Sequence, residues 1–181
     1  MSVNEEIEEL KRSVRRLEDI HEIQQLKYRY LRCMDTGNHE ELATLFHPDV
    51  VVDVVGGSYH IQLNGRDAYV NFIRENIHAG IVAMHHGHHP EIEILSDTTA
   101  HARWYLEDIF IDLEQKTRMQ GSLIYDDDYV KVDGQWLLKS TSYYRVFVIV
   151  EKLDDISLTA HLLAEKGFKH PPGKAKPLSQ L

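Results

Sequence analysis

The chain begins with a long amphipathic pattern that predicts a helix over residues 4–34. Charged residues separate apolar positions that recur every three or four residues, as on one face of an α-helix: Ile7, Leu10, Val14, Leu17, Ile20, Ile23, Leu26 and Tyr30. No glycine or proline interrupts the pattern before Gly37. Such a helix is longer than one small domain needs to cover its sheet, so we expect its first half to pack on a neighbouring subunit. The alternative is a solvated, partly frayed helix.

Shorter elements follow the long helix, and turn residues separate them. Gly37 ends the long helix, and Asn38 with Glu41 forms a capping-box-like start to a short helix through Phe46. His47-Pro48-Asp49 predicts a turn. The remaining elements of this half are strands over 50–55 and 59–63 and a helix over 66–77.

The second half of the chain consists mainly of strand patterns. Stretches rich in β-branched and aromatic residues cover 81–95, 98–113, 118–132 and 135–150, and Ser96-Asp97 and Asp133-Gly134 supply turns between them. The helices come first along the chain and an antiparallel meander follows them, and this order predicts an α+β fold. A twisted, curved sheet closed on one side by helices forms a cone, and its apolar interior suits a small molecule.

The length of 181 residues is typical of one domain with a sizeable core. We therefore expect a single domain over 1–150. Residues 151–181 form a C-terminal extension that serves as a lid or as an oligomer contact. From Lys166 onward, Pro171, Pro172 and Pro177 with Lys and Gly predict a loose tail.

The charge and cysteine content narrow the possible partners and compartments. A net charge of −9 and a pI of about 5.7 argue against nucleic acid and against anionic membranes, since both are bound by clustered Lys and Arg. No apolar run reaches membrane-spanning length, and the acidic N-terminus does not resemble a signal peptide. The single cysteine, Cys33, fits a small core residue in a reducing compartment. We expect a cytoplasmic protein.

Two charged residues fall on faces of strands that are otherwise mostly apolar. Asp108 alternates with Trp104, Leu106 and Phe110, whereas Glu107 lies on the polar face. A carboxylate buried among apolar side chains lowers the stability of the fold by roughly several kcal/mol unless it is paired or protonated. A bulge that returns Asp108 to solvent is the alternative.

Arg145 shares its face with Leu137, Thr141, Tyr143, Phe147 and Ile149. An ion pair between Asp108 and Arg145 would satisfy both groups, and it could be purely structural.

Tyr30 and Asp35 lie near the end of the long helix. Tyr30 belongs to the buried stripe and carries a phenol that can donate a hydrogen bond. Asp35 lies where a carboxylate is unfavourable, because the C-terminus of a helix is the negative end of its dipole. This placement suggests a partner elsewhere in the fold, for example a histidine. The alternative is a simple helix-stop residue.

Four of the twelve histidines lie close together, at positions 85, 86, 88 and 89. Gly80, His86, His88 and Glu93 match most of the first cupin metal motif, but Pro90 interrupts it, Ala100 stands at its final glycine and no second motif follows. The other interpretation is acid–base chemistry by one histidine that faces the cavity. On a strand His85 alternates with His86, so one of these two points inward.

Residues spread over about 15–150 together resemble the SnoaL-like branch of the nuclear-transport-factor-2-like superfamily. The positions that carry the resemblance are Tyr30, Asp35, Gly37, Leu42, Leu45, Phe46, Pro48, Asp49, Gly65, Ala68, His85, His89, Pro90, Ile92, Glu93, Gly121, Tyr125, Asp126, Asp127, Asp133, Gly134 and Trp136. The members most similar in pattern are bile acid 7α-dehydratases; scytalone dehydratase and hexachlorocyclohexane dehydrochlorinase are more distant. The resemblance implies a cone-shaped α+β barrel.

The same resemblance implies a site and a reaction. Its catalytic residues fall on Tyr30, Asp35, His85, Asp108 and Arg145. Asp35 would orient His85, which removes a proton next to a carbonyl, while Tyr30 and a protonated Asp108 stabilise the oxyanion. This is the chemistry of a cofactor-independent, metal-free dehydratase or isomerase acting on a hydrophobic polycyclic molecule of steroid or polyketide type. A homotrimer or another small homo-oligomer is implied too. A non-catalytic protein that binds a lipophilic ligand is the competing interpretation, since the fold alone does not give a reaction.

Overall fold

The computed structural model describes residues 2–170 of the chain. The helices are α1 (Val3–Thr36), α2 (His39–Thr44), α3 (Arg66–Asn76) and α4 (Leu162–Lys166). The strands are β1 (Phe46–Val55), β2 (His60–Asn64), β3 (Ile81–Ile94), β4 (Thr99–Asp112), β5 (Thr117–Val132) and β6 (Gln135–Lys152). Within residues 2–170 no helix is both long and apolar enough to cross a membrane.

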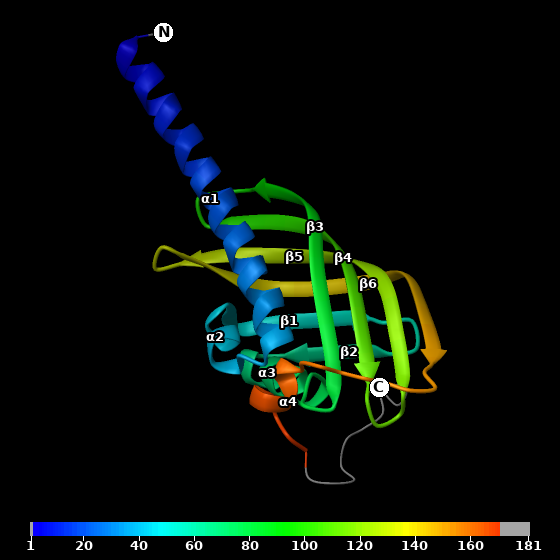
Figure 1. Ribbon diagram of the computed structural model, residues 1–181. Helices are drawn as coiled ribbons and strands as arrows, with labels where there is room; N and C mark the ends of the chain where they lie inside the picture. The colour runs from blue at the N-terminus through cyan, green and yellow to red at the C-terminus, as the bar shows by residue number, and fades with distance from the viewer. Residues whose placement is uncertain (1, 171–181) are drawn as a thin grey trace.

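The six strands form one curved sheet in the order β2-β1-β6-β5-β4-β3 (Figure 1). β3 to β6 make the expected antiparallel meander, and β1 then joins β6 in parallel. Helix α1 crosses one face of this sheet, while α2, α3 and α4 gather near its C-terminal end (Figure 1). The architecture is therefore the expected α+β fold, with the helices on one face of a curved sheet.

The two halves of α1 have different surroundings. Ser2 caps the helix in a capping box with Glu5, and Gly37 ends it in the left-handed conformation at φ 65°. The C-terminal half buries Ile23, Leu26 and Tyr30 in the core. The N-terminal half extends beyond the sheet (Figure 1), and its apolar side chains are exposed: Val3, Ile7, Leu10, Val14 and Leu17.

The core lies between the sheet and the helices. It joins the buried half of α1 with Leu42 of α2, Ile73 of α3 and inward residues of the strands such as Trp104 and Leu138. Burying side chains of this size stabilises the folded state by about 1.5–3 kcal/mol each. Cys33 belongs to the same core, as expected.

The strand β1 begins earlier than the sequence suggests. The prediction of a turn at His47-Pro48-Asp49 is wrong, because these residues lie inside β1. Pairing with β6 shifts between Phe46 and Val51, so Pro48 lies where the ladder is irregular and its missing N–H is tolerated. The short helix preceding β1 ends at Thr44, two residues before the expected Phe46.

A bulge in β6 corrects the predicted face of two residues. Leu123 pairs with Arg145 and Ser122 with Phe147, so Val146 is the extra residue and the alternation of faces changes there. Arg145 faces the interior as expected. Phe147 and Ile149, which were placed on the same face, are 50% and 58% exposed. A second bulge, at Lys139, puts Leu137 on the opposite face from Thr141, so the placement of Leu137 beside Arg145 is wrong as well.

The C-terminal segment packs on the molecule up to His170. Leu163 of α4 is buried, with its side chain beside Gly37. The carbonyl of Phe168 accepts a hydrogen bond from Ala79 N at 2.9 Å, and His170 Nε2 lies 3.0 Å from the carbonyl oxygen of Glu75. The expected loose tail from Lys166 is therefore wrong as far as residue 170. Pro171, Pro172 and Pro177 lie outside the described residues.

Candidate active site

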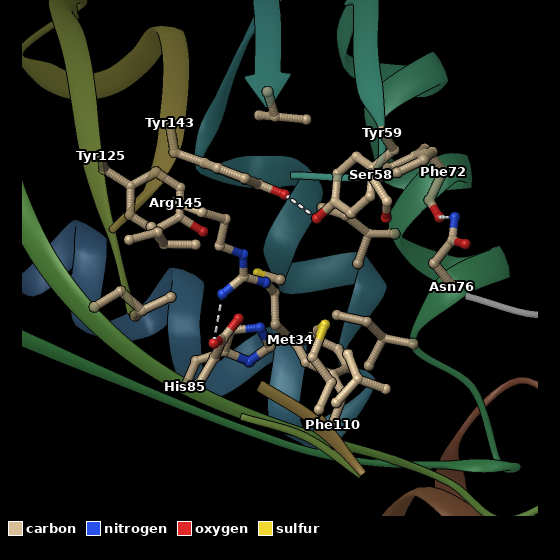
Figure 2. A pocket seen from close by; sticks show the side chains of 18 of the residues that line it. Met34, Ser58, Tyr59, Phe72, Asn76, His85, Phe110, Tyr125, Tyr143 and Arg145 are labelled. Atoms are coloured by element: carbon tan, nitrogen blue, oxygen red, sulfur yellow. Dashed lines mark hydrogen bonds and ion pairs between the residues drawn. The ribbon is translucent and has the colours of Figure 1, made fainter. Parts of the chain in front are cut away.

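A cavity of about 220 Å³ lies between the sheet and helices α1 and α3 (Figure 2). Its wall is mostly apolar, with Met34 from α1, Phe72 from α3 and Phe110 from β4. Polar side chains enter it from separate elements and are described below: Tyr30, Tyr59, Tyr69, His85, Asp108, Tyr125, Tyr143 and Arg145. An apolar hollow with a few converging polar groups is typical of a small-molecule site.

His85 and Asp35 form a hydrogen-bonded pair at the wall of the cavity. His85 Nδ1 lies 2.6 Å from Asp35 Oδ1, and the backbone N–H of His85 donates to Asp35 Oδ2 at 3.0 Å. The imidazole is 3% exposed and the carboxylate 26%. Because β3 is an edge strand, the outward backbone N–H of His85 has no strand partner on that side and can donate to the carboxylate at the end of α1. The carboxylate therefore favours a proton on Nδ1 and leaves Nε2 as the acceptor.

The close packing of β3 against α1 brings this pair together. A side chain at Gly87, two residues after His85, would place its Cβ 2.7 Å from Leu31 Cδ1 on α1. The absence of a side chain there lets the strand approach the helix. The ring of Phe110 meets the imidazole edge-on, with the two ring centroids 5.0 Å apart.

Asp108 and Arg145 form a second buried pair in the same cavity. Arg145 Nη1 donates to Asp108 Oδ1 at 2.6 Å, and the side chains are 6% and 2% exposed respectively. Figure 2 shows the guanidinium beside His85, and Asp108 is the register partner of His85. A Cβ at Gly121 would lie 3.1 Å from Arg145 Nη1, so the glycine makes room for the guanidinium. Arg145 Nε is buried without a hydrogen-bond partner among the described residues.

Five tyrosines surround these pairs or adjoin the cavity. The hydroxyls of Tyr30 and Tyr69 are 2.7 Å apart, and those of Tyr59 and Tyr143 are 2.6 Å apart. Tyr125 lies edge-on to both Tyr30 and Tyr143. Apart from the loop residue Tyr59, these tyrosines project from α1, α3, β5 and β6, so rigid elements position most of them.

A buried cation lies behind Tyr30 and Tyr125. Lys27 Nζ donates to Asp127 Oδ2 at 2.8 Å, and it lies 3.5 Å from the ring centroid of Tyr125 and 4.6 Å from that of Tyr30. Asp127 also accepts hydrogen bonds from Tyr129 at 2.9 Å and from Thr141. The ion pair of Lys27 and Asp127 therefore packs against the rings of Tyr30 and Tyr125 and helps to hold them in place.

Burial shifts the pKa values of several of these groups. Burial raises the pKa of Tyr30 well above 10.0, and nearby Tyr125 and Tyr69 add to this effect. The pKa values of Tyr69, Tyr125 and Tyr143 are raised as well, mainly by burial. Burial opposes the charge of Arg145, but the hydrogen bond and charge of Asp108 outweigh it and raise the pKa of the guanidinium. These four tyrosines are therefore neutral hydroxyls and Arg145 is a cation.

The structure places four of the five predicted site residues on the cavity wall: Tyr30, His85, Asp108 and Arg145. Asp35 lies behind His85 as its hydrogen-bond partner. The prediction that Asp108 faces the interior is correct. Asp108 accepts a hydrogen bond from Arg145 in the structure. The sequence analysis had instead expected a protonated Asp108 that donates one.

Several residues of the site were not predicted. Lys27 lies four residues after Ile23 and three before Tyr30, so the helical periodicity that marked those two also marks it as buried. Likewise, Asp127 shares its face of β5 with Tyr125 and Tyr129. The spacing of apolar residues therefore marks both Lys27 and Asp127 as buried.

The cupin-like ligand set is not assembled. Within residues 2–170, the group whose ligand atoms come close enough to share an ion is His86, His88 and Glu107, without Glu93. His86 is exposed whereas His85 is 6% exposed, so the predicted alternation of the two histidines is correct. A metal on this group would lie on the opposite face of the sheet from the cavity.

Comparison with known proteins assigns the fold to a family. The family model of the SnoaL-like domain matches residues 15–142. The chain belongs to the SnoaL-like family. This SnoaL-like protein resembles a crystal structure of a putative scytalone dehydratase from Novosphingobium aromaticivorans, at 25% identity and a TM-score of 0.69 over 91% of this chain and 99% of the other.

Two further structures share the fold of this SnoaL-like protein. Hexachlorocyclohexane dehydrochlorinase LinA-type3 from Novosphingobium barchaimii matches with a TM-score of 0.70 and 17% identity, over 82% of this chain and 99% of the other. An NTF2-like protein with a cystatin-like fold from Novosphingobium aromaticivorans matches with a TM-score of 0.62 and 22% identity, over 76% and 88%. The expected superfamily is therefore confirmed, while the nearer likeness to bile acid 7α-dehydratase stays a prediction.

The geometry of the SnoaL-like site suits proton transfer. It combines a histidine held by a carboxylate with neutral hydroxyls and a buried cation around one apolar space. A base and electrophilic donors arranged in this way can remove a proton and stabilise the negative charge that develops.

Proposed function

We propose that the chain is a cofactor-independent lyase of the hydro-lyase type, or an isomerase, that abstracts a proton next to a carbonyl of a hydrophobic substrate. The observation that supports this most is the 2.6 Å bond between His85 Nδ1 and Asp35 Oδ1 at the wall of an apolar cavity. A carboxylate on one ring nitrogen makes the other a stronger base and fixes its direction. Such general base catalysis contributes about 10²–10⁴-fold to rate.

In the proposed reaction, His85 Nε2 takes the proton from the carbon beside the carbonyl. The electrons move onto the carbonyl oxygen, and Tyr30 and Arg145 are the donors that stabilise this oxyanion. Tyr30 suits this role because its raised pKa keeps the phenol protonated. In a dehydration the enolate electrons return and expel the hydroxyl from the β- or vinylogous carbon, and this group takes the proton from His85 and leaves as water. In an isomerisation His85 returns the proton to another carbon.

The cavity constrains the substrate. Its volume of about 220 Å³ is smaller than the roughly 300–1,000 Å³ typical of sites for drug-sized ligands. A polycyclic substrate of steroid or polyketide type therefore requires a wider mouth or partial entry, whereas a compound of one or two rings fits as the cavity stands. The names of the putative scytalone dehydratase and of the dehydrochlorinase, both elimination enzymes, support a lyase.

The test is exchange of a substrate proton for deuterium in enones of one ring and of several rings. The wild-type protein is expected to catalyse exchange, whereas His85→Ala and Asp35→Asn lower its rate by about 10²-fold or more. His60→Ala is the matched control, because His60 and Asp53 form an exposed pair with the same 2.6 Å separation. Exchange by His85→Ala at the wild-type rate would refute the mechanism. Saturable binding without exchange in the wild type would favour a carrier protein.

We also propose that the chain works as a homo-oligomer in the cytoplasm, through the exposed half of α1. Ile7 and Val14 occupy a positions of a heptad repeat, and Val3, Leu10 and Leu17 occupy d positions. Such β-branched a and mostly Leu d residues favour two parallel strands. In that arrangement Glu6 at g faces Lys11 at e of the second copy, which adds complementary charge to the apolar seam.

A further inference from the structure

A group of potential metal ligands lies on the outer face of the sheet, behind the candidate active site. His86 and His88 are two residues apart on β3, so both imidazoles point to the same face. Glu107 on β4 is the register partner of His86 and points to that face as well. Nothing in the proposed reaction uses these three side chains.

The donor atoms of these three residues lie close enough to converge on one small ion. One donor atom from each residue lies within 4.8 Å of the other two. In a tetrahedral site, bonds of about 2.0–2.2 Å from zinc to nitrogen or oxygen place two ligand atoms about 3.3–3.6 Å apart. Rotation of these surface side chains brings the donor atoms to that distance, while the two paired strands hold their backbones in place.

The surroundings of Glu107 resemble the support that metal ligands usually have. Gln120 Nε2 donates to Glu107 Oε1 at 3.4 Å, and Gln120 Oε1 in turn accepts from Arg118 Nη2 at 2.6 Å. Glu151 pairs with Arg118 Nη1 at 3.3 Å, which compensates the charge of the guanidinium. Hydrogen bonds of this kind orient a ligating carboxylate and strengthen the binding of its metal.

We propose that His86, His88 and Glu107 form a binding site for a divalent transition metal, with zinc as the ion that two imidazoles and one carboxylate suit best. Three protein ligands leave a fourth position for water. The ion would link the edge strand β3 to β4, directly behind the pair of His85 and Asp108. The proposed site is independent of the proposed reaction, because it lies on the opposite face of these strands.

The test uses the full chain without a histidine tag, freed of metal with a chelator and titrated with zinc chloride in a calorimeter. Wild type is expected to bind about one zinc ion per chain, and His88→Ala and Glu107→Gln to weaken binding at least about tenfold. His101→Ala is the matched control. His101 lies on β4, as Glu107 does, but its imidazole pairs with Asp126 and Asp128. Its zinc affinity is expected to equal that of the wild type.

Two further measurements make the result specific. Zinc is expected to raise the midpoint of thermal unfolding of the wild type but not of His88→Ala, since a ligand stabilises the state that binds it. Circular dichroism of each metal-free variant establishes that it is folded. The proposal fails if zinc does not bind saturably, if His88→Ala and Glu107→Gln bind it as tightly as wild type, or if His85→Ala abolishes binding instead.

Discussion

At the scale of single residues, Lys27 shows how a buried charge supports the site without touching the cavity. Its side chain is fully buried, and burial lowers the pKa of the ammonium despite the opposing effect of Asp127. The ammonium is retained because Asp127 accepts a hydrogen bond from it and the rings of Tyr30 and Tyr125 face it. Buried pairs of this kind contribute little net stability, but removal of one partner leaves the other charge uncompensated.

Lys27→Met is therefore expected to lower the free energy of unfolding by about 3–5 kcal/mol, because Asp127 remains buried without its cation. The double variant Lys27→Met with Asp127→Asn should regain part of this loss. Arg103→Met is the control, since Arg103 pairs with Asp126 on the exposed face of β4 and its loss changes stability by about 0.5 kcal/mol or less. Urea denaturation measures all three. Wild-type stability in Lys27→Met would contradict this account of the ion pair.

At the scale of elements, the apolar and polar pattern locates most helices and strands to within a few residues. The exceptions arise where pairing overrides local preference. His47-Pro48-Asp49 has the composition of a turn, yet it lies in β1, between Phe46 and Val51, which both pair with β6. Strict alternation in β6 misplaces Phe147, because the pattern alone does not reveal that Val146 is an extra residue. Turn and strand propensities are weak beside tertiary contacts of this kind.

The exposed half of α1 gives a prediction about this element alone. Leu10→Asp should lower the mass of the oligomer, because it places a charge at the central d position of the proposed two-stranded seam. Arg12→Ala is the control, since position 12 is an f position on the far side of the same helix. Light scattering after size exclusion gives the masses. An unchanged mass in Leu10→Asp would rule out this seam, and so would equal dissociation in Arg12→Ala.

At the scale of the whole molecule, the site depends on the order of the strands. The alternation of faces shows from the sequence that Asp108 and Arg145 point inward, but their contact depends on β5 lying between β4 and β6 and on the bulge at Lys139, which sets Arg145 opposite Leu123. Likewise, the sequence suggests a partner for Asp35, and the packing of α1 over the edge strand β3 brings His85 to it across 50 residues. Long-range register of this kind is not encoded in any local pattern.

The same packing predicts how the molecule as a whole responds to alkali. Burial raises the pKa values of five tyrosines: Tyr30, Tyr69, Tyr125, Tyr129 and Tyr143. Below the ordinary phenol value of 10.0 both states keep these protons. Above it the unfolded chain loses them while the folded one holds them, so the free energy of unfolding falls as pH rises. Lys27 acts in the opposite sense, because its lowered pKa lets the folded state release a proton first.

Five phenols outweigh one ammonium, so stability should decline between about pH 9 and about pH 11. Urea denaturation across this range measures the decline, and ultraviolet absorbance of phenolate follows ionisation in parallel. The phenolate signal of the buried tyrosines should appear together with unfolding, because these side chains ionise only once water reaches them. Constant stability over the range, or full ionisation of a still folded chain, would mean that water reaches these phenols in the folded protein. The cavity would then be too wet for the proposed oxyanion donors to act at their full strength.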